Sequence, residues 1–270
     1  MRLLLVQVST GGDPVANRAA IRDAVSAGLA SSGPVDLVVL PEAAQVDFGD
    51  GQSLRDTAET LDGPFVGLLG ELAAASGGTV VGGMFEAAKG GRPYNTLVAV
   101  GPGGGLAATY RKAHLYDAFG YRESDLVSPG EAAATTLAVS GRDGTRLTVG
   151  LMTCYDLRFP EQARALVDAS ADLLLVPAAW LRGERKQAHW ATLLAARAIE
   201  NTVYVAGVAK AGPRYCGLTR LVDPMGEVLA ELGEQDGTVA AQVEPARIAE
   251  VRRVNPSLAN RRWDVLPRRS

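Results

Sequence analysis

Two segments of the chain repeat one pattern, and this repeat limits the possible folds more than any other feature. Residues 35–43 (VDLVVLPEA) and 171–179 (ADLLLVPAA) both contain an aspartate, four aliphatic residues and a proline, followed by small or acidic residues. Uninterrupted aliphatic runs are typical of parallel strands that are buried on both faces. The repeat predicts two similar halves of alternating strands and helices. We therefore expect an α/β protein in which two mixed sheets pack face to face with helices outside.

The apolar periodicity predicts strands and helices in both halves. Between the predicted strands 96–100 and 106–110, the glycine-rich run 101–105 indicates a hairpin turn and not a phosphate loop. No linker rich in proline, glycine or serine separates the halves, so we expect one domain over residues 1–270. The other predicted strands are 3–8, 35–40, 79–85, 146–151, 172–176, 203–208, 218–223, 228–231 and 239–243, and the predicted helices are 17–30, 64–76, 160–168 and 186–201.

Composition argues against several classes of function. The chain is 47% hydrophobic and carries a formal net charge of −3, which predicts a folded core and no nucleic-acid partner. We interpret the arginine pairs at 252–253, 261–262 and 268–269 as a solvated or dimer-contacting tail. No apolar run reaches the roughly 18 residues that a membrane span needs, and the first residues do not form a signal peptide. We therefore expect no membrane partner.

The cysteine and histidine content is low. Only Cys154 and Cys216 are present, which predicts a cytoplasmic protein without a disulfide framework and a structural role for Cys216. His114 and His189 are too few and too scattered for a zinc site, so packing and hydrogen-bonding roles are expected for both. We expect no metal ion and no cofactor.

Three reactive side chains each follow a predicted strand. Glu42 comes after strand 35–40, Lys112 after strand 106–110 and Cys154 after strand 146–151. Functional groups of α/β proteins gather at the carboxyl ends of strands. Each residue alone has a structural explanation, as a helix-start acid, a surface charge or a small buried thiol. Together they predict a single site.

The three residue types suit nucleophilic catalysis. A thiol needs a base to become a nucleophile at neutral pH. Burial raises the pKa of a carboxyl group, which can then take the thiol proton and return it. A fixed ammonium can stabilise the tetrahedral oxyanion and the thiolate, and it lowers the pKa of the carboxyl group.

The segments around these residues resemble the nitrilase or carbon–nitrogen hydrolase superfamily. The resemblance implies that Glu42 is the general base, Lys112 the oxyanion stabiliser and Cys154 the nucleophile, and that Glu123 orients the lysine and the substrate. It also implies a four-layer αββα sandwich and a homodimer or higher homo-oligomer formed through the helices that follow the cysteine. The matching segments are 40–42 (LPE), 111–117 (RKAHLYD), 122–124 (RES), 128–130 (SPG), 150–161 (GLMTCYDLRFPE), 177–180 (PAAW), 189–190 (HW), 197–201 (RAIEN) and 223–228 (DPMGEV).

Residues 114–117 and 154–161 are most similar to the small-amidase branch, which includes omega-amidases and deaminated glutathione amidases. That similarity implies hydrolysis of a terminal carboxamide on a small carboxylic acid, with ammonia released through a cysteine thioester. Residues 215–219 (YCGLT) and Met225 depart from the branch pattern, which leaves the exact substrate open. A nitrilase or an N-carbamoyl amine hydrolase with the same site is the alternative; a metal enzyme lacks ligands, and an inactive scaffold would need a broken triad.

Other residues near the triad segments are predicted to contact the substrate. The backbone amide of Tyr155 is expected to hold the oxyanion together with Lys112. Ala179 and Trp180, just past the second repeated segment, are also expected to bind the substrate or the oxyanion. Arg158 is expected either to hold a substrate carboxylate or to pair with Asp156 or Glu161, and we favour the internal pair.

Overall fold

The two large sheets share one strand order and one pairing pattern, as the repeated segments predict. The computed structural model describes residues 1–266. In each sheet, three neighbouring parallel strands are flanked by one antiparallel strand on one side and two on the other. The first sheet has the order β14 (Gly237–Gln242), β1 (Arg2–Gln7), β2 (Leu37–Val39), β3 (Thr79–Glu86), β4 (Tyr94–Val100) and β5 (Leu106–Arg111). The second has the order β13 (Val228–Glu231), β12 (Arg220–Val222), β11 (Tyr204–Ala209), β10 (Leu173–Ala178), β9 (Arg146–Leu151) and β8 (Thr136–Ser140).

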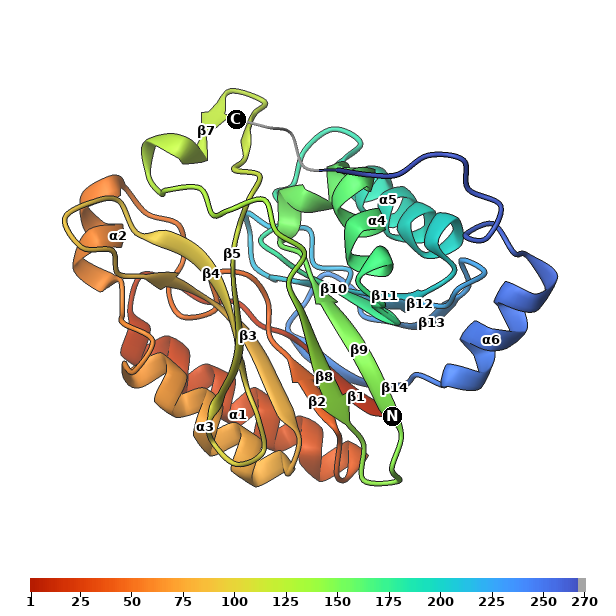
Figure 1. The fold of residues 1–270 in the computed structure, drawn as a ribbon. Coiled ribbons are helices and arrows are strands. Elements are labelled where there is room, and N and C mark those ends of the chain that lie inside the picture. Colours follow the sequence, from red (N-terminus) through yellow and green to blue (C-terminus); the bar gives the residue numbers. More distant parts are fainter. Residues whose placement is uncertain (267–270) are drawn as a thin grey trace.

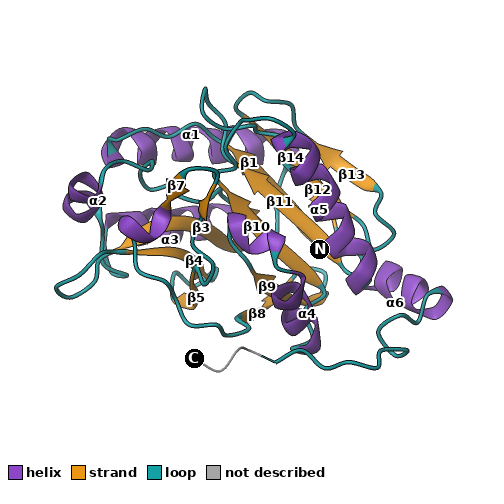
Figure 2. Cartoon of the chain, turned by 90° about the horizontal axis from the view of Figure 1, so that it is seen from above, coloured by secondary structure: helices purple, strands orange, loops and turns teal. Residues whose placement is uncertain are grey.

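The sheets pack against each other, and helices cover their outer faces (Figures 1 and 2). Successive side chains of a strand point to opposite faces, so each central strand needs apolar residues on both sides. In β1, Leu3 and Leu5 pack into the core between the sheets, whereas Leu4 and Val6 pack into the core under the first helices. The covering helices are α1 (Pro14–Ser32) and α3 (Pro64–Ser76) on the first sheet, and α4 (Pro160–Asp168) and α5 (Lys186–Asn201) on the second. The predicted four-layer αββα sandwich is confirmed.

Local signals explain where the helices begin and end. The Asp13 side chain accepts hydrogen bonds from the backbone amides of Val15 and Ala16, so α1 starts three residues before the predicted position. Proline at the first position of α1, α3 and α4 fits the fixed φ of a helix start. Gly77, with φ of 68°, ends α3 in the left-handed region that favours glycine.

Several short elements were not predicted. They include α2 (Gly51–Thr57), α6 (Pro245–Val254), β8, the two-stranded hairpin β6 (Asp117–Ala118) with β7 (Tyr121–Arg122), and two 3₁₀ turns at Glu123–Asp125 and Cys154–Arg158. The predicted turn at 101–105 is confirmed, because β4 and β5 pair antiparallel across it. Helices within residues 1–266 are too short or too polar to cross a bilayer. The arginine pair 268–269 lies outside the described residues.

Candidate active site

Glu42, Lys112, Glu123 and Cys154 line one pocket. Glu42 follows β2, Lys112 follows β5 and Cys154 follows β9, while Glu123 starts the 3₁₀ turn after β7. The structure therefore brings together the four residues that the sequence singles out. The other lining residues are Phe48, Tyr116, Tyr121, Tyr155, Ala179, Trp180, Leu181, Lys186, Arg214 and Tyr215.

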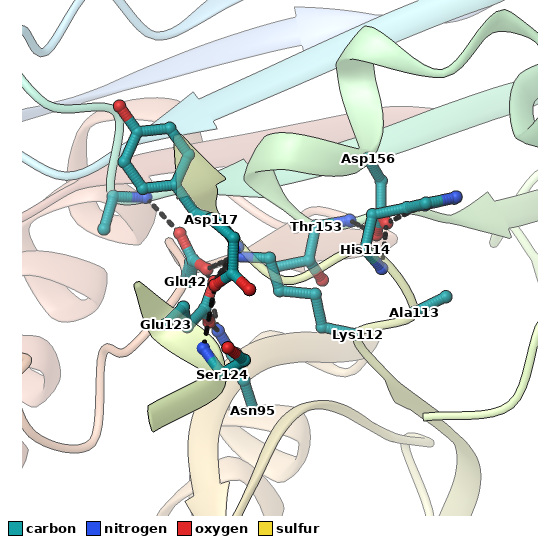
Figure 3. Close-up of polar contacts among 12 residues, drawn as sticks. Glu42, Asn95, Lys112, Ala113, His114, Asp117, Glu123, Ser124, Thr153 and Asp156 are labelled. Atoms are coloured by element: carbon teal, nitrogen blue, oxygen red, sulfur yellow. Dashed lines mark hydrogen bonds and ion pairs between the residues drawn. The ribbon is translucent and has the colours of Figure 1, made fainter. Parts of the chain in front are cut away.

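The ammonium of Lys112 lies between two buried carboxylates (Figure 3). Its Nζ is 2.8 Å from Glu42 Oε1 and 2.8 Å from Glu123 Oε2, and all three side chains are about 1% exposed or less. The side-chain amide of Asn95 donates to both acids, at 2.8 Å to Glu42 and 2.9 Å to Glu123. Three charged groups and one amide thus form a cluster in which Lys112 and Asn95 each donate to both carboxylates.

Backbone contacts fix the position of Glu42. Ala43, the next residue, has φ of 51°, so the chain turns sharply as it leaves the strand. Gly83 in β3 packs directly against this turn, because a Cβ at Gly83 would lie 2.7 Å from Ala43 N and from Glu42 Cα. On the opposite sheet, the amide of Ala179 donates to Glu42 Oε2 at 2.6 Å. One oxygen of Glu42 therefore faces Lys112 and Asn95, and the other is held by Ala179.

A strained turn presents Cys154. Its φ of 48° is unusual for a residue with a side chain, and it opens the 3₁₀ turn Cys154–Arg158. The Asp156 carboxylate closes this turn by accepting a hydrogen bond from the backbone amide of Thr153 at 2.8 Å. Asp156 also accepts from the Tyr110 hydroxyl at 2.7 Å and contacts His114 Nδ1 at 2.8 Å. A buried acid from the cysteine segment thus joins it to the lysine segment.

Charge and burial set the ionisation of the three central groups. Burial alone would raise the pKa of Glu42, but the Lys112 charge and hydrogen bonds from Lys112, Ala179 and Asn95 outweigh it and lower the pKa. Burial would lower the pKa of Lys112, but Glu123 and Glu42 raise it well above the ordinary value. Burial and the Glu42 charge raise the pKa of Cys154 well above that of a free thiol. The resting site therefore holds a carboxylate, an ammonium and a protonated thiol.

A sequence model of the carbon-nitrogen hydrolase family matches residues 4–253. The chain belongs to the carbon–nitrogen hydrolase family. It is 40% identical to the deaminated glutathione amidase of Escherichia coli O157:H7 over 87% of each chain. It is 31% identical to the human omega-amidase over 98% of this chain and 95% of the relative.

Solved structures agree with this membership. A carbon–nitrogen hydrolase superfamily protein from Xanthomonas campestris, with an arsenic adduct in its active site, superposes with a TM-score of 0.86. It is 32% identical, and the match covers 99% of both chains. A nitrilase-superfamily protein from Saccharomyces cerevisiae also has a TM-score of 0.86, at 29% identity over 97% of each chain.

Three further residues of this carbon–nitrogen hydrolase that are predicted to contact the substrate or the oxyanion lie at the pocket. Tyr155 and Trp180 line the pocket, and the indole of Trp180 donates to the Lys186 carbonyl at 2.8 Å. Ala179 also lines the pocket, and its backbone amide donates to Glu42 at 2.6 Å, because the end of β10 lies against the carboxylate from the other sheet. Its expected contact with the substrate or the oxyanion stays a prediction.

The predicted pairing of Arg158 is wrong. Asp156 accepts from Tyr110, Thr153 and His114 instead, and Glu161 forms no ion pair with Arg158 within residues 1–266. The Arg158 guanidinium lies 3.4 Å from His189 Nδ1 and 5.0 Å from the centre of the Trp180 ring. Asp156, the buried acid expected to pair with Arg158, already accepts hydrogen bonds from these other groups.

The histidines and the second cysteine have structural contacts. His114 stacks on Phe159 with ring centres 3.8 Å apart and contacts Asp156, as expected for a packing and hydrogen-bonding residue. Cys216 is fully buried, packs in the core beneath α4 and α5 and does not line the pocket. Over the described part of the chain, no group of three His, Cys, Asp or Glu side chains is arranged to hold a metal ion.

Sequence reasoning missed Asn95 and Lys186. Asn95 is a buried polar residue near the start of β4, before its apolar residues 97–100, which is a detectable signal, since buried polar groups need partners. Lys186 follows a run of exposed, mostly charged residues in the sequence, so nothing local predicts its low exposure. That low exposure follows only from the tertiary fold.

Proposed function

We propose that this enzyme hydrolyses the terminal carboxamide of a small carboxylic acid and releases ammonia, as an omega-amidase or a deaminated glutathione amidase does. The observation that carries the proposal is the buried cluster of Lys112 with Glu42 and Glu123, in the same pocket as Cys154. The relatives named for these two activities support it. We propose that residues 1–270 work as one catalytic domain.

The proposed reaction begins with attack on the amide. Cys154 Sγ bonds to the carbonyl carbon while its proton passes to Glu42, and Lys112 with the Tyr155 backbone amide stabilises the oxyanion. The oxyanion collapses, the carbon–nitrogen bond breaks, and Glu42 returns the proton to the departing ammonia. A thioester on Cys154 remains.

Water then completes the cycle. Glu42 takes a proton from a water molecule that attacks the thioester, and a second tetrahedral intermediate forms at the same oxyanion site. The carbon–sulfur bond breaks, the acid leaves, and the proton on Glu42 returns to the sulfur. Glu123 holds Lys112 in place in both steps through the 2.8 Å ion pair, and it orients the substrate amide in the first step.

The oligomeric state and the cellular location of the enzyme are also part of the proposal. We propose a homodimer or higher homo-oligomer formed through α4 and α5, and the half-exposed Ile199 on α5 is consistent with a covered apolar face. We also propose a reducing, cytoplasmic location, because both cysteines are free thiols and the nucleophile must stay reduced. Light scattering of the purified protein tests the proposed oligomeric state.

The test compares an amide with its matching nitrile. Purified enzyme is incubated with 4-carbamoylbutanoate or with 4-cyanobutanoate, and ammonia release is measured beside a Cys154→Ala control. We expect release from the amide that depends on Cys154. Release from the nitrile alone would favour the nitrilase alternative, and release from an N-carbamoyl amine alone would favour a carbamoyl hydrolase.

A further inference from the structure

Lys186 is a buried lysine of the pocket wall. It is the first residue of α5, its exposed fraction is 6%, and it lines the same pocket as Cys154. Its ammonium donates one hydrogen bond, to the Tyr116 hydroxyl at 2.7 Å. The ammonium also lies 4.0 Å from the centre of the Phe119 ring. Within residues 1–266 it forms no ion pair with an aspartate or glutamate.

The other buried lysines have acidic partners. Lys112 is held by two glutamates, and Lys210 Nζ lies 2.8 Å from Asp47 Oδ1. An ammonium has three donors, and Lys186 uses one of them on the described residues. The Lys186 ammonium is partly buried, with aromatic rings but no acidic side chain beside it, and a desolvated charge without a counter-ion carries a free-energy cost.

A second positive charge lies near Lys186. The Arg158 guanidinium is 5.0 Å from the Trp180 ring centre and 5.6 Å from that of Phe119, two rings that the Lys186 ammonium also contacts. Burial and the Arg158 charge lower the pKa of Lys186. An anion bound beside Lys186 would relieve both the desolvation and the repulsion.

The pocket offers this anion few other partners. The ammonium of Lys112 is already shared by two carboxylates. Arg214, which is half exposed, lies 3.6 Å from Asp47. Lys186 is therefore the pocket-lining cation of the described chain that remains without an acidic partner.

We infer that Lys186 and the Tyr116 hydroxyl anchor the carboxylate of the substrate. The inference rests on the proposed amidase function and narrows its substrate class to linear amides with a carboxylate at the far end. The Lys186 ammonium donates to a carboxylate oxygen, and the Tyr116 hydroxyl donates to the other or orients the ammonium. The rings of Tyr116, Phe119 and Trp180 surround the Lys186 ammonium, with ring centres 4.7, 4.0 and 5.7 Å away.

The kinetic test uses two amides of equal length. 4-Carbamoylbutanoate carries the carboxylate, and pentanamide does not. In Lys186→Met, we expect kcat/KM for the carboxylate substrate to fall roughly 10- to 100-fold relative to pentanamide, mainly through KM, because one charge-assisted hydrogen bond is lost. Lys186→Arg should recover part of the preference, and Tyr116→Phe should show a smaller loss.

Matched controls separate this role from folding and from catalysis. Lys89→Met changes an exposed lysine and should keep the parent preference. If Lys186→Met lowers kcat/KM for both amides equally, or keeps the parent preference, the anchor is wrong. Calorimetry of glutarate binding to Cys154→Ala, with and without Lys186→Met, tests the anchor without turnover. If glutarate binding depends on Lys186 but the parent enzyme cleaves neither amide, only the proposed amidase function is contradicted. If Cys154→Ala binds glutarate equally well with and without Lys186→Met, the anchor is overturned.

Discussion

The Lys112 ammonium lies 2.8 Å from the Glu42 carboxylate, although 70 residues separate the two in the chain. Glu42 follows β2 and Lys112 follows β5, two strands that end at the same edge of the first sheet with β3 and β4 between them. The pair lowers the pKa of Glu42 and raises that of Lys112. The Glu42 carboxylate is therefore ionised before substrate arrives, and in the proposed mechanism the proton transfer from Cys154 is the step that the bound substrate must promote.

Glu42→Gln keeps the shape of the base and removes its proton-accepting oxygen. Loss of a general base costs about 10²–10⁴-fold in rate, and we expect at least this loss in ammonia release because acylation and deacylation both use Glu42. Alkylation of Cys154 by iodoacetamide should slow as well. A variant that alkylates and turns over like the parent would remove Glu42 from the base role.

Glu123→Gln leaves the base in place and weakens the hold on Lys112. The ion pair at 2.8 Å becomes a neutral contact, so the lysine and the substrate amide lose their fixed positions. We expect slower turnover with near-parent alkylation of Cys154, and trapped acyl-enzyme in the intact-protein mass. Equal loss of alkylation in Glu123→Gln and Glu42→Gln would contradict the division of roles between the two acids.

Gly83→Ala tests the contact that shapes the Glu42 turn. The new Cβ would meet backbone atoms of Glu42 and Ala43 at 2.7 Å, and overpacking of this kind costs about 1–3 kcal/mol. We expect a lower melting temperature and a lower kcat. The matched control is Gly67→Ala in α3, where nothing lies within 4 Å, and a helix-propensity gain of up to about 1 kcal/mol is expected. A Gly83→Ala variant as stable and active as the parent would contradict the close packing.

His114 should make stability depend on pH. Burial alone would lower its pKa, but the hydrogen bond and charge of Asp156 raise it above 6.5. Because the folded-state pKa is the higher one, this stabilisation is fully present below pH 6.5 and is lost as pH rises through the folded-state pKa. The free energy of unfolding of the parent, minus that of His114→Gln, should therefore be larger at pH 5.5 than at pH 9. A difference that grows with pH would refute the contact.

The sequence predicts the layers and the site well, for specific physical reasons. Aliphatic runs such as 35–40 and 171–176 are strong signals because strands buried on both faces tolerate few polar residues. The short elements α2, β8 and α6 are weaker signals, since runs of 7, 5 and 10 residues carry little periodicity and tertiary contacts decide them. The pairing expected for Arg158 is wrong for another reason. Asp156 accepts hydrogen bonds from Tyr110 and His114, which lie more than 40 positions away in the chain, and no local pattern reveals these contacts.

The most direct test of the account is the mass of the enzyme during turnover. Enzyme quenched in acid after mixing with 4-carbamoylbutanoate, and digested for peptide mapping, should carry an acyl group on Cys154 with the mass of the substrate less ammonia. The adduct should be absent from Cys154→Ala, which should also release no ammonia. An acyl group mapped to Cys216, or ammonia release by Cys154→Ala at the parent rate, would contradict the thioester mechanism.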